Sequence, residues 1–263
     1  MERRQFIVTL VTNLTASRLA VVAGVGGSVV DCASSAARPG GAAGAGAERL
    51  DRIGLQLYTV RDALAKDFEG TLARVAATGY REVEFAGYMG RRPEAVRAVL
   101  ERNGLRAPSA HVALQEMRTR MPAVVEAAHV IDHDYIVVPY LPEEERRTMP
   151  QYERLADELN TLGRRARDAD LRLAYHNHDF EFTRMDGRLP YDLLLERTDP
   201  QLVSFEMDLY WITKAGHDPL AYFDRFPGRF RMVHVKDSSG WSRSTPLMPI
   251  ALAARQNSRS GID

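Results

Sequence analysis

The chain has 263 residues, enough for one large domain or two small ones. Lysine plus arginine equals aspartate plus glutamate at 35 each, so no basic excess indicates nucleic acid or an anionic membrane as a partner. Apolar residues make up 45% and charged residues 27%, an ordinary balance for a globular protein. A single cysteine, Cys32, excludes an internal disulfide framework and a cysteine-ligated zinc site.

Residues 1–47 differ from the rest of the chain and are typical of an export signal followed by an Ala/Gly-rich linker. Two arginines precede Phe6 and Ile7 in a pattern that resembles the twin-arginine motif, which directs folded proteins to the periplasm. The apolar stretch that follows is too weak for a stable membrane span, which needs about 20 mostly apolar residues. Cleavage is expected after Ala47 or after Ala37. The alternative is a cytoplasmic tail without fixed structure.

From Ile53 onward, strand-like and helix-like segments alternate. Short apolar runs predict strands at 53–60, 81–87, 106–114, 135–140, 171–178, 202–210 and 230–237. Apolar residues at helical spacing predict helices between them, at 64–79, 93–104, 121–131, 150–170, 190–198 and 218–226. The strands are mostly apolar on both faces, as expected for a parallel sheet that is covered by helices.

Two α/β architectures suit this alternation: a (β/α)₈ TIM barrel and an open doubly wound sheet. The first strand is not followed by Gly-x-Gly-x-x-Gly, the main signature of a dinucleotide-binding open sheet. Polar residues instead recur where many strands end, at Glu84, His111, His176, Asp208 and His234. Because the active site of a barrel is built at that end, we predict a TIM barrel over residues 51–237, with about seven strands.

Three successive strands carry side chains that are typical metal ligands. His176 and His178 are two residues apart on a strand and therefore face the same side, as do Glu206 and Asp208. A lone histidine at a strand end is more often structural, but His234 on the next strand adds to a cluster. Imidazole and carboxylate ligands suit Mn, Fe, Co, Ni or Zn rather than Ca. The sequence therefore predicts one divalent metal ion.

Four segments resemble the xylose isomerase-like TIM-barrel superfamily, the sugar phosphate isomerase/epimerase group that also includes inosose dehydratases and ketose 3-epimerases. They are IGLQLYTVRD (53–62), YHNHDFEF (175–182), FEMDLYW (205–211) and HVKD (234–237). The resemblance covers about residues 51–237. It implies a metal-dependent enzyme that acts on a small-molecule sugar, with Mn, Co, Mg or Zn as the cofactor.

Members of this superfamily hold the metal through a strand-five Glu, a strand-six Asp, a strand-seven His and a strand-eight Glu. Carried over, Asp208 and His234 are the strand-six and strand-seven ligands. His176 stands where many members have a glutamate that is both ligand and acid/base group, so a simple two-glutamate epimerase is disfavoured. The resemblance thus implies His176, Asp208 and His234 as metal ligands, with His178 in a supporting or substrate-contacting position.

The reaction that the resemblance implies is proton abstraction next to a carbonyl of a sugar or keto-sugar. Isomerisation, epimerisation, dehydration or β-elimination follows, depending on where the proton returns or what leaves. The candidate catalytic residues are Glu84, His111, His178 and Lys236. Of these, Lys236 is a weaker candidate, as is Glu206, which is about equally well explained as a salt-bridged residue of the barrel interior. Tyr210 and Trp211 are candidates for stacking on a sugar, although packing is the commoner role of such aromatics.

Residues 238–263 break the pattern. The segment contains no acidic residue before the terminal Asp263 and no clear strand, whereas the family continues with an eighth strand that carries the fourth ligand and a last helix. We interpret this tail as the product of a shifted reading frame or a truncated gene. The first and seventh strands are then expected to have unpaired edges and the chain to be poorly stable. Pairing in a homo-oligomer is one remedy left open.

Two other function classes remain as alternatives. The superfamily also includes metal-dependent endonucleases that act at abasic sites, but these use a three-metal cluster and need a surface that binds DNA. The neutral charge balance and the expected export argue against that class. A degenerate, non-catalytic barrel that binds carbohydrate is the third hypothesis, because the expected eighth strand is missing.

Overall fold

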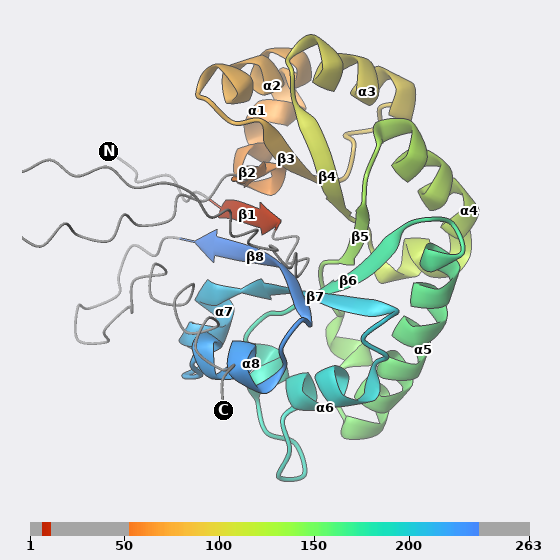
Figure 1. Ribbon diagram of the computed structural model, residues 1–263, viewed down its shortest axis with the longest axis vertical. Coiled ribbons are helices and arrows are strands. Elements are labelled where there is room, and N and C mark those ends of the chain that lie inside the picture. The colour runs from red at the N-terminus through yellow and green to blue at the C-terminus, as the bar shows by residue number, and fades with distance from the viewer. Residues whose placement is uncertain (1–6, 12–52, 237–263) are drawn as a thin grey trace, which may run out of the picture. The chain divides into compact units, whose positions relative to one another are not determined.

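The parallel barrel predicted from the sequence is present. The computed structural model describes residues 7–11 and 53–236, with side chains for 53–236, so Cys32, both cleavage sites and the 238–263 tail lie outside the described residues. Seven parallel strands follow one another in chain order (Figure 1). They are β2 (Gly54–Gln56), β3 (Glu82–Ala86), β4 (Arg106–His111), β5 (Tyr135–Val138), β6 (Arg172–His176), β7 (Val203–Asp208) and β8 (Phe230–Lys236). The α/β fold class, with an incomplete set of parallel strands, is therefore confirmed.

Helices connect consecutive strands along the outside of the sheet (Figure 1). They are α1 (Arg61–Lys66), α2 (Phe68–Ala77), α3 (Pro93–Arg102), α4 (Leu114–Ile131), α5 (Met149–Arg167), α6 (Pro190–Arg197), α7 (Leu209–Lys214) and α8 (Pro219–Arg225). Three short 3₁₀ helices lie at Leu57–Val60, Glu143–Glu145 and Phe180–Phe182. Within the described residues, no helix is both long and apolar enough to cross a membrane.

Side-chain caps explain where the elements differ from the predicted ranges. The first strand ends early because the Gln56 side chain accepts a hydrogen bond from the backbone N–H of Tyr58 and starts a 3₁₀ turn. The helix expected at 64–79 is divided at Asp67, whose carboxylate accepts a hydrogen bond from Gly70 N at 2.9 Å and caps α2. Helix α7 was not predicted; Asp208 caps it.

Helix α4 begins earlier than the predicted range of 121–131. Its backbone is non-helical at Arg120, with φ −136° and ψ 28°, and Pro122 follows in the next turn. Proline is tolerated in the first turn of a helix, where its missing N–H has no partner to lose. The predicted range therefore corresponds to the second half of a kinked helix.

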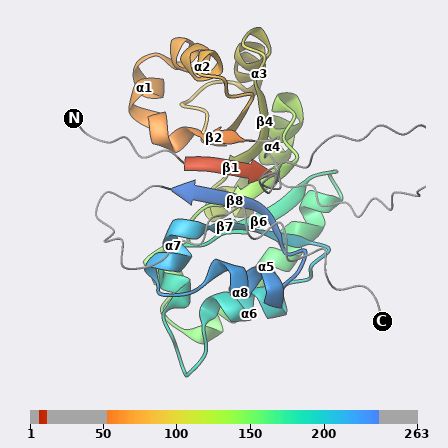
Figure 2. The ribbon, with the colours of Figure 1, turned by 60° about the vertical axis from the view of Figure 1, so that its left-hand side comes forward.

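A short strand from the N-terminal segment, β1 (Ile7–Val11), lies between β2 and β8 and runs antiparallel to both (Figure 2). Thr9 lies opposite Gly54 of β2 and His234 of β8. The expectation that the outer parallel strands have unpaired edges is therefore wrong. The sequence IVTLV is apolar and β-branched, as strands prefer, and an open sheet edge is a template for pairing with such a segment.

Because β1 is antiparallel, it is not the eighth parallel strand of the family. It also lies inside the segment interpreted as an export signal. Cleavage after Ala37 or Ala47 would remove β1 from the sheet.

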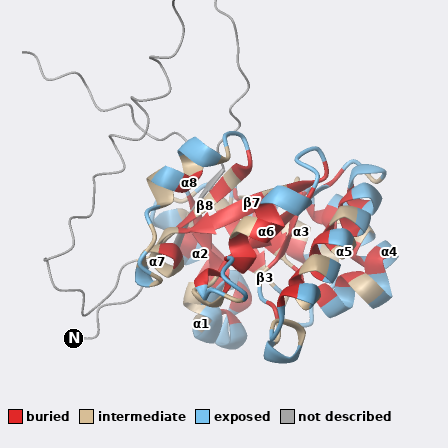
Figure 3. Cartoon of the chain, turned by 90° about the horizontal axis from the view of Figure 1, so that it is seen from below, coloured by how far each residue is buried: buried red, intermediate tan, exposed pale blue. Residues whose placement is uncertain are grey.

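The core lies between the strands and the helices that cover them (Figure 3). Phe85, Leu159 and Phe205 are fully buried in one continuous apolar cluster. Helix α5 approaches the sheet so closely that a Cβ atom at Gly163 would lie 2.5 Å from the carbonyl oxygen of Leu202. This packing fixes the strands, whose C-terminal ends carry the polar residues of the site.

Replacing Thr9 by proline tests whether β1 stabilises the barrel. Proline has no N–H to donate and is excluded from strands that are paired on both sides. We expect Thr9→Pro to lower the free energy of unfolding by about 1–3 kcal/mol. Each kcal/mol lowers the Tm of a domain of this size by roughly 2–4 °C, which circular dichroism can measure. Thr9→Val keeps a strand-forming residue and serves as the control. Equal Tm values for Thr9→Pro and Thr9→Val would show that the pairing of β1 does not stabilise the barrel.

Candidate metal centre and active site

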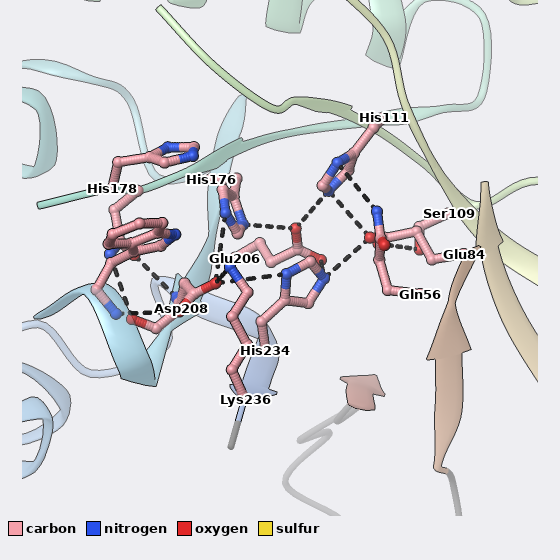
Figure 4. A network of polar contacts seen from close by, with 12 residues as sticks. Gln56, Glu84, Ser109, His111, His176, His178, Glu206, Asp208, His234 and Lys236 are labelled. Atoms are coloured by element: carbon pink, nitrogen blue, oxygen red, sulfur yellow. Dashed lines mark hydrogen bonds and ion pairs between the residues drawn. The ribbon is translucent and has the colours of Figure 1, made fainter. Parts of the chain in front are cut away.

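The C-terminal ends of five strands bring acidic and imidazole side chains together (Figure 4). The sheet register places His176 of β6 beside Glu206 of β7, and Asp208 of β7 beside His234 of β8. Strands β3 and β4 add Glu84 and His111. All of these side chains are buried except His111, which is slightly exposed. The strand order therefore concentrates three carboxylates and three imidazoles in one small volume.

Glu206 lies at the centre of this cluster. Its Oε2 atom lies 2.9 Å from His111 Nε2 and 3.1 Å from His176 Nδ1, and its Oε1 atom lies 3.2 Å from His234 Nε2. Burial would raise the pKa of Glu206, but the charge on His234 and the hydrogen bonds from the imidazoles hold it well below its usual range. An ionised carboxylate only accepts hydrogen bonds, so the imidazole nitrogens that face it are donors.

Glu84 forms a second set of contacts with two of these imidazoles, those of His111 and His234. Its Oε1 atom lies 2.9 Å from His234 Nε2 and 2.9 Å from His111 Nε2, and the Ser109 hydroxyl donates a hydrogen bond to Oε2 at 2.6 Å. Burial would lower the pKa of His111 and His234, but the two glutamates outweigh it and raise these pKa values to about 9 and about 10. Both imidazoles are therefore protonated at neutral pH in the metal-free protein.

The ring nitrogens of His176 and His234 that do not contact the glutamates face Asp208. His176 Nε2 lies 3.6 Å and His234 Nδ1 lies 3.9 Å from Asp208 Oδ2. The other carboxylate oxygen, Oδ1, accepts hydrogen bonds from the backbone N–H groups of Tyr210 and Trp211 at 3.0 and 3.1 Å. This fixes the carboxylate with Oδ2 pointing at the two imidazoles.

His176 Nε2 and His234 Nδ1 lie at separations from Asp208 Oδ2 that are near those between ligands of a single divalent cation. Ligand atoms that surround one first-row ion at about 2.0–2.2 Å lie roughly 3–3.6 Å from one another, close to the separations around Asp208 Oδ2. Within the described residues, His234 Nδ1 is buried and makes no hydrogen bond, and the buried Asp208 Oδ2 has the Lys236 ammonium group as its close partner. Buried polar atoms are normally satisfied, so His234 Nδ1 has capacity for a ligand once the imidazole releases its proton, and Asp208 Oδ2 has capacity for one if Lys236 moves away. The predicted ligands His176, Asp208 and His234 are thus brought together.

A second set of ligand atoms lies deeper. One atom each from His111, His176, Glu206 and His234 all lie within 4.8 Å of one another. In this set the imidazole nitrogens already donate to Glu206 or Glu84. We therefore favour the set around Asp208, because metal-binding histidines are commonly oriented by a carboxylate on their other nitrogen. Glu206 and Glu84 supply that carboxylate.

His178 lies beside this cluster and not within its polar contacts. Its ring stacks on Phe180 with the centroids 5.4 Å apart and lies 5.3 Å from the Trp211 and Tyr140 rings. Burial lowers the pKa of His178 to about 3, so the imidazole is neutral. Its Nδ1 atom is buried and has no hydrogen-bond partner among the described residues. The ring thus offers one free polar atom in an aromatic surrounding.

Glu181 holds the backbone at His178. Its Oε2 atom accepts a hydrogen bond from His178 N at 2.8 Å, and its Oε1 atom accepts one from the Tyr175 hydroxyl at 2.8 Å. Burial raises the pKa of Glu181 to about 7 despite these hydrogen bonds. The neighbouring Asn177 accepts a hydrogen bond from Asp208 N at 2.9 Å, so the segment after β6 is tied to β7 as well.

The structure places the predicted catalytic residues in different surroundings. Glu84 and His111 lie in the buried network, Lys236 contacts Asp208, and His178 lies among aromatic rings. The sequence interpretation ranked Glu206 too low, although its spacing of two from Asp208 placed it on the same strand face. Sequence reasoning missed Glu181 and Asn177, which hold the backbone and which no spacing rule identifies.

Replacing Glu181 by glutamine should remove one part of the pH dependence of stability. Between the ordinary pKa of 4.5 and about 7, the folded protein keeps a proton on Glu181 that the unfolded chain has released. The free energy of unfolding should therefore fall as pH rises through this window, and level off above it. Glu181→Gln can keep both hydrogen bonds, because a tyrosine hydroxyl also accepts. Denaturant titrations at several pH values should show a flatter curve for this variant.

The control is Glu143→Gln at an exposed carboxylate, which should keep the wild-type slope. Identical curves for wild type and Glu181→Gln would contradict the raised pKa.

Comparisons of the sequence with known proteins point to one family. The sequence profile described as "Xylose isomerase-like TIM barrel" matches residues 72–247. Inosose dehydratase of Clostridium tetani is 25% identical over 191 residues, which cover 65% of this chain and 63% of that protein. Inosose dehydratase 2 of Bacillus cereus is 31% identical over 124 residues, which cover 47% of this chain and 41% of that protein. The chain thus spans less than two thirds of the length of these relatives.

Solved structures agree on the fold. The crystal structure of a sugar phosphate isomerase/epimerase from Parabacteroides distasonis superposes with a TM-score of 0.59 at 26% identity. The match covers 67% of this chain and 72% of that one. The family profile spans more than half of this chain, and the described residues form the parallel barrel that the profile predicts. The chain therefore belongs to the xylose isomerase-like TIM barrel family.

Proposed function

We propose that the chain is a metal-dependent sugar isomerase or epimerase that abstracts a proton next to a carbonyl of a sugar or keto-sugar. The observation that carries this proposal is the convergence of His176 Nε2, Asp208 Oδ2 and His234 Nδ1 at the C-terminal end of the barrel. All three side chains are buried, and His234 Nδ1 makes no hydrogen bond within the described residues. Sugar phosphate isomerase/epimerase activity, named for the Parabacteroides distasonis protein, supports this reaction class.

A divalent cation held by these atoms would polarise a substrate carbonyl oxygen and stabilise the negative charge that develops when the neighbouring proton leaves. The remaining residues prepare the site. Glu206 accepts a hydrogen bond from His176 Nδ1, and Glu84 accepts one from His234 Nε2. These hydrogen bonds direct the other nitrogen of each imidazole toward Asp208. The backbone N–H groups at the start of α7 hold the Asp208 carboxylate in position.

His178 is the residue that we propose moves the substrate proton. It is neutral, and its free Nδ1 can accept a proton or a hydrogen bond from a substrate hydroxyl. A proton taken by His178 can be delivered to the neighbouring carbon, which completes an isomerisation, whereas an epimerisation needs a proton donor on the opposite face of the sugar. Glu84 and His111 are too deeply engaged with each other for this task and serve to orient the ligands.

The aromatic residues around His178 suit a polyhydroxylated ring. Trp211, Phe180 and Tyr140 surround the imidazole, and Tyr140 is 46% exposed. An aromatic face packs against the C–H side of a sugar and leaves the hydroxyl groups free for hydrogen bonds. We propose that these rings form one wall of the substrate site.

A dehydratase or lyase is the second candidate, favoured by the names of the curated relatives, which are inosose dehydratases. The first step is the same, but a hydroxyl group then leaves from the next carbon. Reaction in D₂O separates the two: an epimerase or isomerase yields a saturated product that carries deuterium. A dehydratase yields an unsaturated or rearranged ketone with a new ultraviolet absorbance. Binding of sugar without turnover, insensitive to chelator, would indicate a non-catalytic carbohydrate-binding barrel.

Replacing Asp208 by asparagine should abolish tight metal binding. The change removes the negative charge at the oxygen that faces both imidazoles. We expect the variant to lose its metal during dialysis and to lose turnover of aldoses and ketoses supplied with Mn, Co, Mg or Zn. Metal content is measured by mass spectrometry of the dialysed protein. Asp192→Asn, at a partly buried carboxylate that pairs with Arg225 on the outer helices, is the control. Equal metal retention in both variants would exclude Asp208 as a ligand.

Replacing Glu206 by glutamine should weaken metal binding less than Asp208→Asn does. The new amide group presents donors to imidazole N–H groups, so the rings lose their orientation. Loss of such an orienting carboxylate typically lowers metal affinity about 10–100-fold. Glu158→Gln, which disturbs only an ion pair with Arg118, is the control for a lost glutamate charge. A greater loss in Glu206→Gln than in Asp208→Asn would instead place the metal in the deeper set of ligands.

A further inference from the structure

Lys236 is the last residue of β8 and lies two residues after His234, so both side chains face the interior of the barrel. Its ammonium group contacts Asp208 Oδ2 directly (Figure 4). The Lys236 side chain is only 17% exposed and the Asp208 side chain is fully buried. This ion pair therefore lies at the end of the barrel and not on its outer surface.

The ammonium group occupies the side of Asp208 that a metal ion would use. The contacted oxygen is the same one that lies 3.6 Å from His176 Nε2 and 3.9 Å from His234 Nδ1. The other oxygen is held by backbone N–H groups and faces away. A divalent cation bound by Asp208, His176 and His234 would have to contact the oxygen that Lys236 now neutralises.

Electrostatics makes the two cations alternatives. An ionised carboxylate that is buried without a close positive partner is strongly unfavourable, and Lys236 contacts Asp208 Oδ2 more closely than the His234 imidazole does, so Lys236 is its main counter-ion. An ammonium group and a divalent ion at one oxygen would repel each other strongly in this buried surrounding. Lysine carries its charge on a flexible four-carbon stem and can withdraw without a change in the backbone.

We propose that Lys236 is a built-in counter-ion that neutralises Asp208 in the metal-free protein and is displaced when the metal binds. The inference rests on the proposed metal site. The ammonium group that contacts Asp208 also lies 5.1 Å from the centroid of the Trp211 ring, so the aromatic wall is next to it when it leaves the carboxylate. Metal binding therefore has two effects: it fills the ligand set and it frees a cation at the wall of the substrate site. The metal affinity of the wild-type protein is limited by the ion pair that must be broken.

The test is the affinity for Mn²⁺ alone, measured on the full chain by the electron paramagnetic resonance signal of the free ion. Lys236→Met keeps the stem and removes the charge, so Mn²⁺ no longer competes with it. We expect the dissociation constant to fall by at least about tenfold. Lys214→Met is the matched control, because Lys214 pairs with Asp179 and lies 4.5 Å from the same Trp211 ring but does not touch Asp208. Its dissociation constant should equal that of the wild type.

The outcomes separate this inference from the proposed function. Unchanged or weaker Mn²⁺ binding by Lys236→Met, with normal binding by wild type, overturns the role of Lys236 and leaves the metal site intact. No Mn²⁺ binding by any variant overturns both. Mn²⁺ binding by Lys236→Met but not by the wild type supports the inference, because the wild-type lysine then excludes the Mn²⁺ ion.

A measurement on the wild type covers the case in which Lys236→Met fails to fold. Acetylation of Lys236, followed by peptide mass spectrometry, should be faster with saturating Mn²⁺ than with chelator, while Lys214 stays unchanged. Equal rates at Lys236 would overturn the displacement.

Discussion

Three carboxylates that are fully withdrawn from solvent at one end of the barrel set the constraint on which the site depends. Glu84, Glu206 and Asp208 each have no exposed surface, and like charges in so small a volume must be balanced. His111 and His234 balance the two glutamates, and Lys236 balances Asp208. The ion pairs of the site provide this compensation.

The same constraint gives each imidazole two different sides. On His176 and His234, one nitrogen donates to a buried glutamate, and the other faces Asp208. A histidine fixed in this way presents its second nitrogen in a defined direction, which is what a metal ion or a polarised substrate requires. The two nitrogens that face Asp208 are therefore positioned by the protein itself, and Lys236 contacts the same Asp208 oxygen.

The antiparallel strand β1 shows how a sheet with an incomplete parallel set can still pair its edges. Strand β8 carries His234 and Lys236, and its outer edge pairs with Ile7–Val11. Without such a partner, the strand that carries His234 and Lys236 would be an edge strand, with backbone groups free to pair elsewhere. The position of β8 thus links the stability of the barrel to the geometry of the site.

The alternation of apolar runs and helical segments was sufficient to predict a parallel barrel, because burial of both sheet faces leaves a clear mark on sequence. Strand-end positions also predicted His176, Asp208 and His234 as a group, and the structure brings these side chains together. The sequence could not decide that Glu206 joins three imidazoles, that Lys236 neutralises Asp208 or that β1 pairs with both outer strands. Those contacts join residues distant along the chain, and only the register and closure of the sheet bring them within reach.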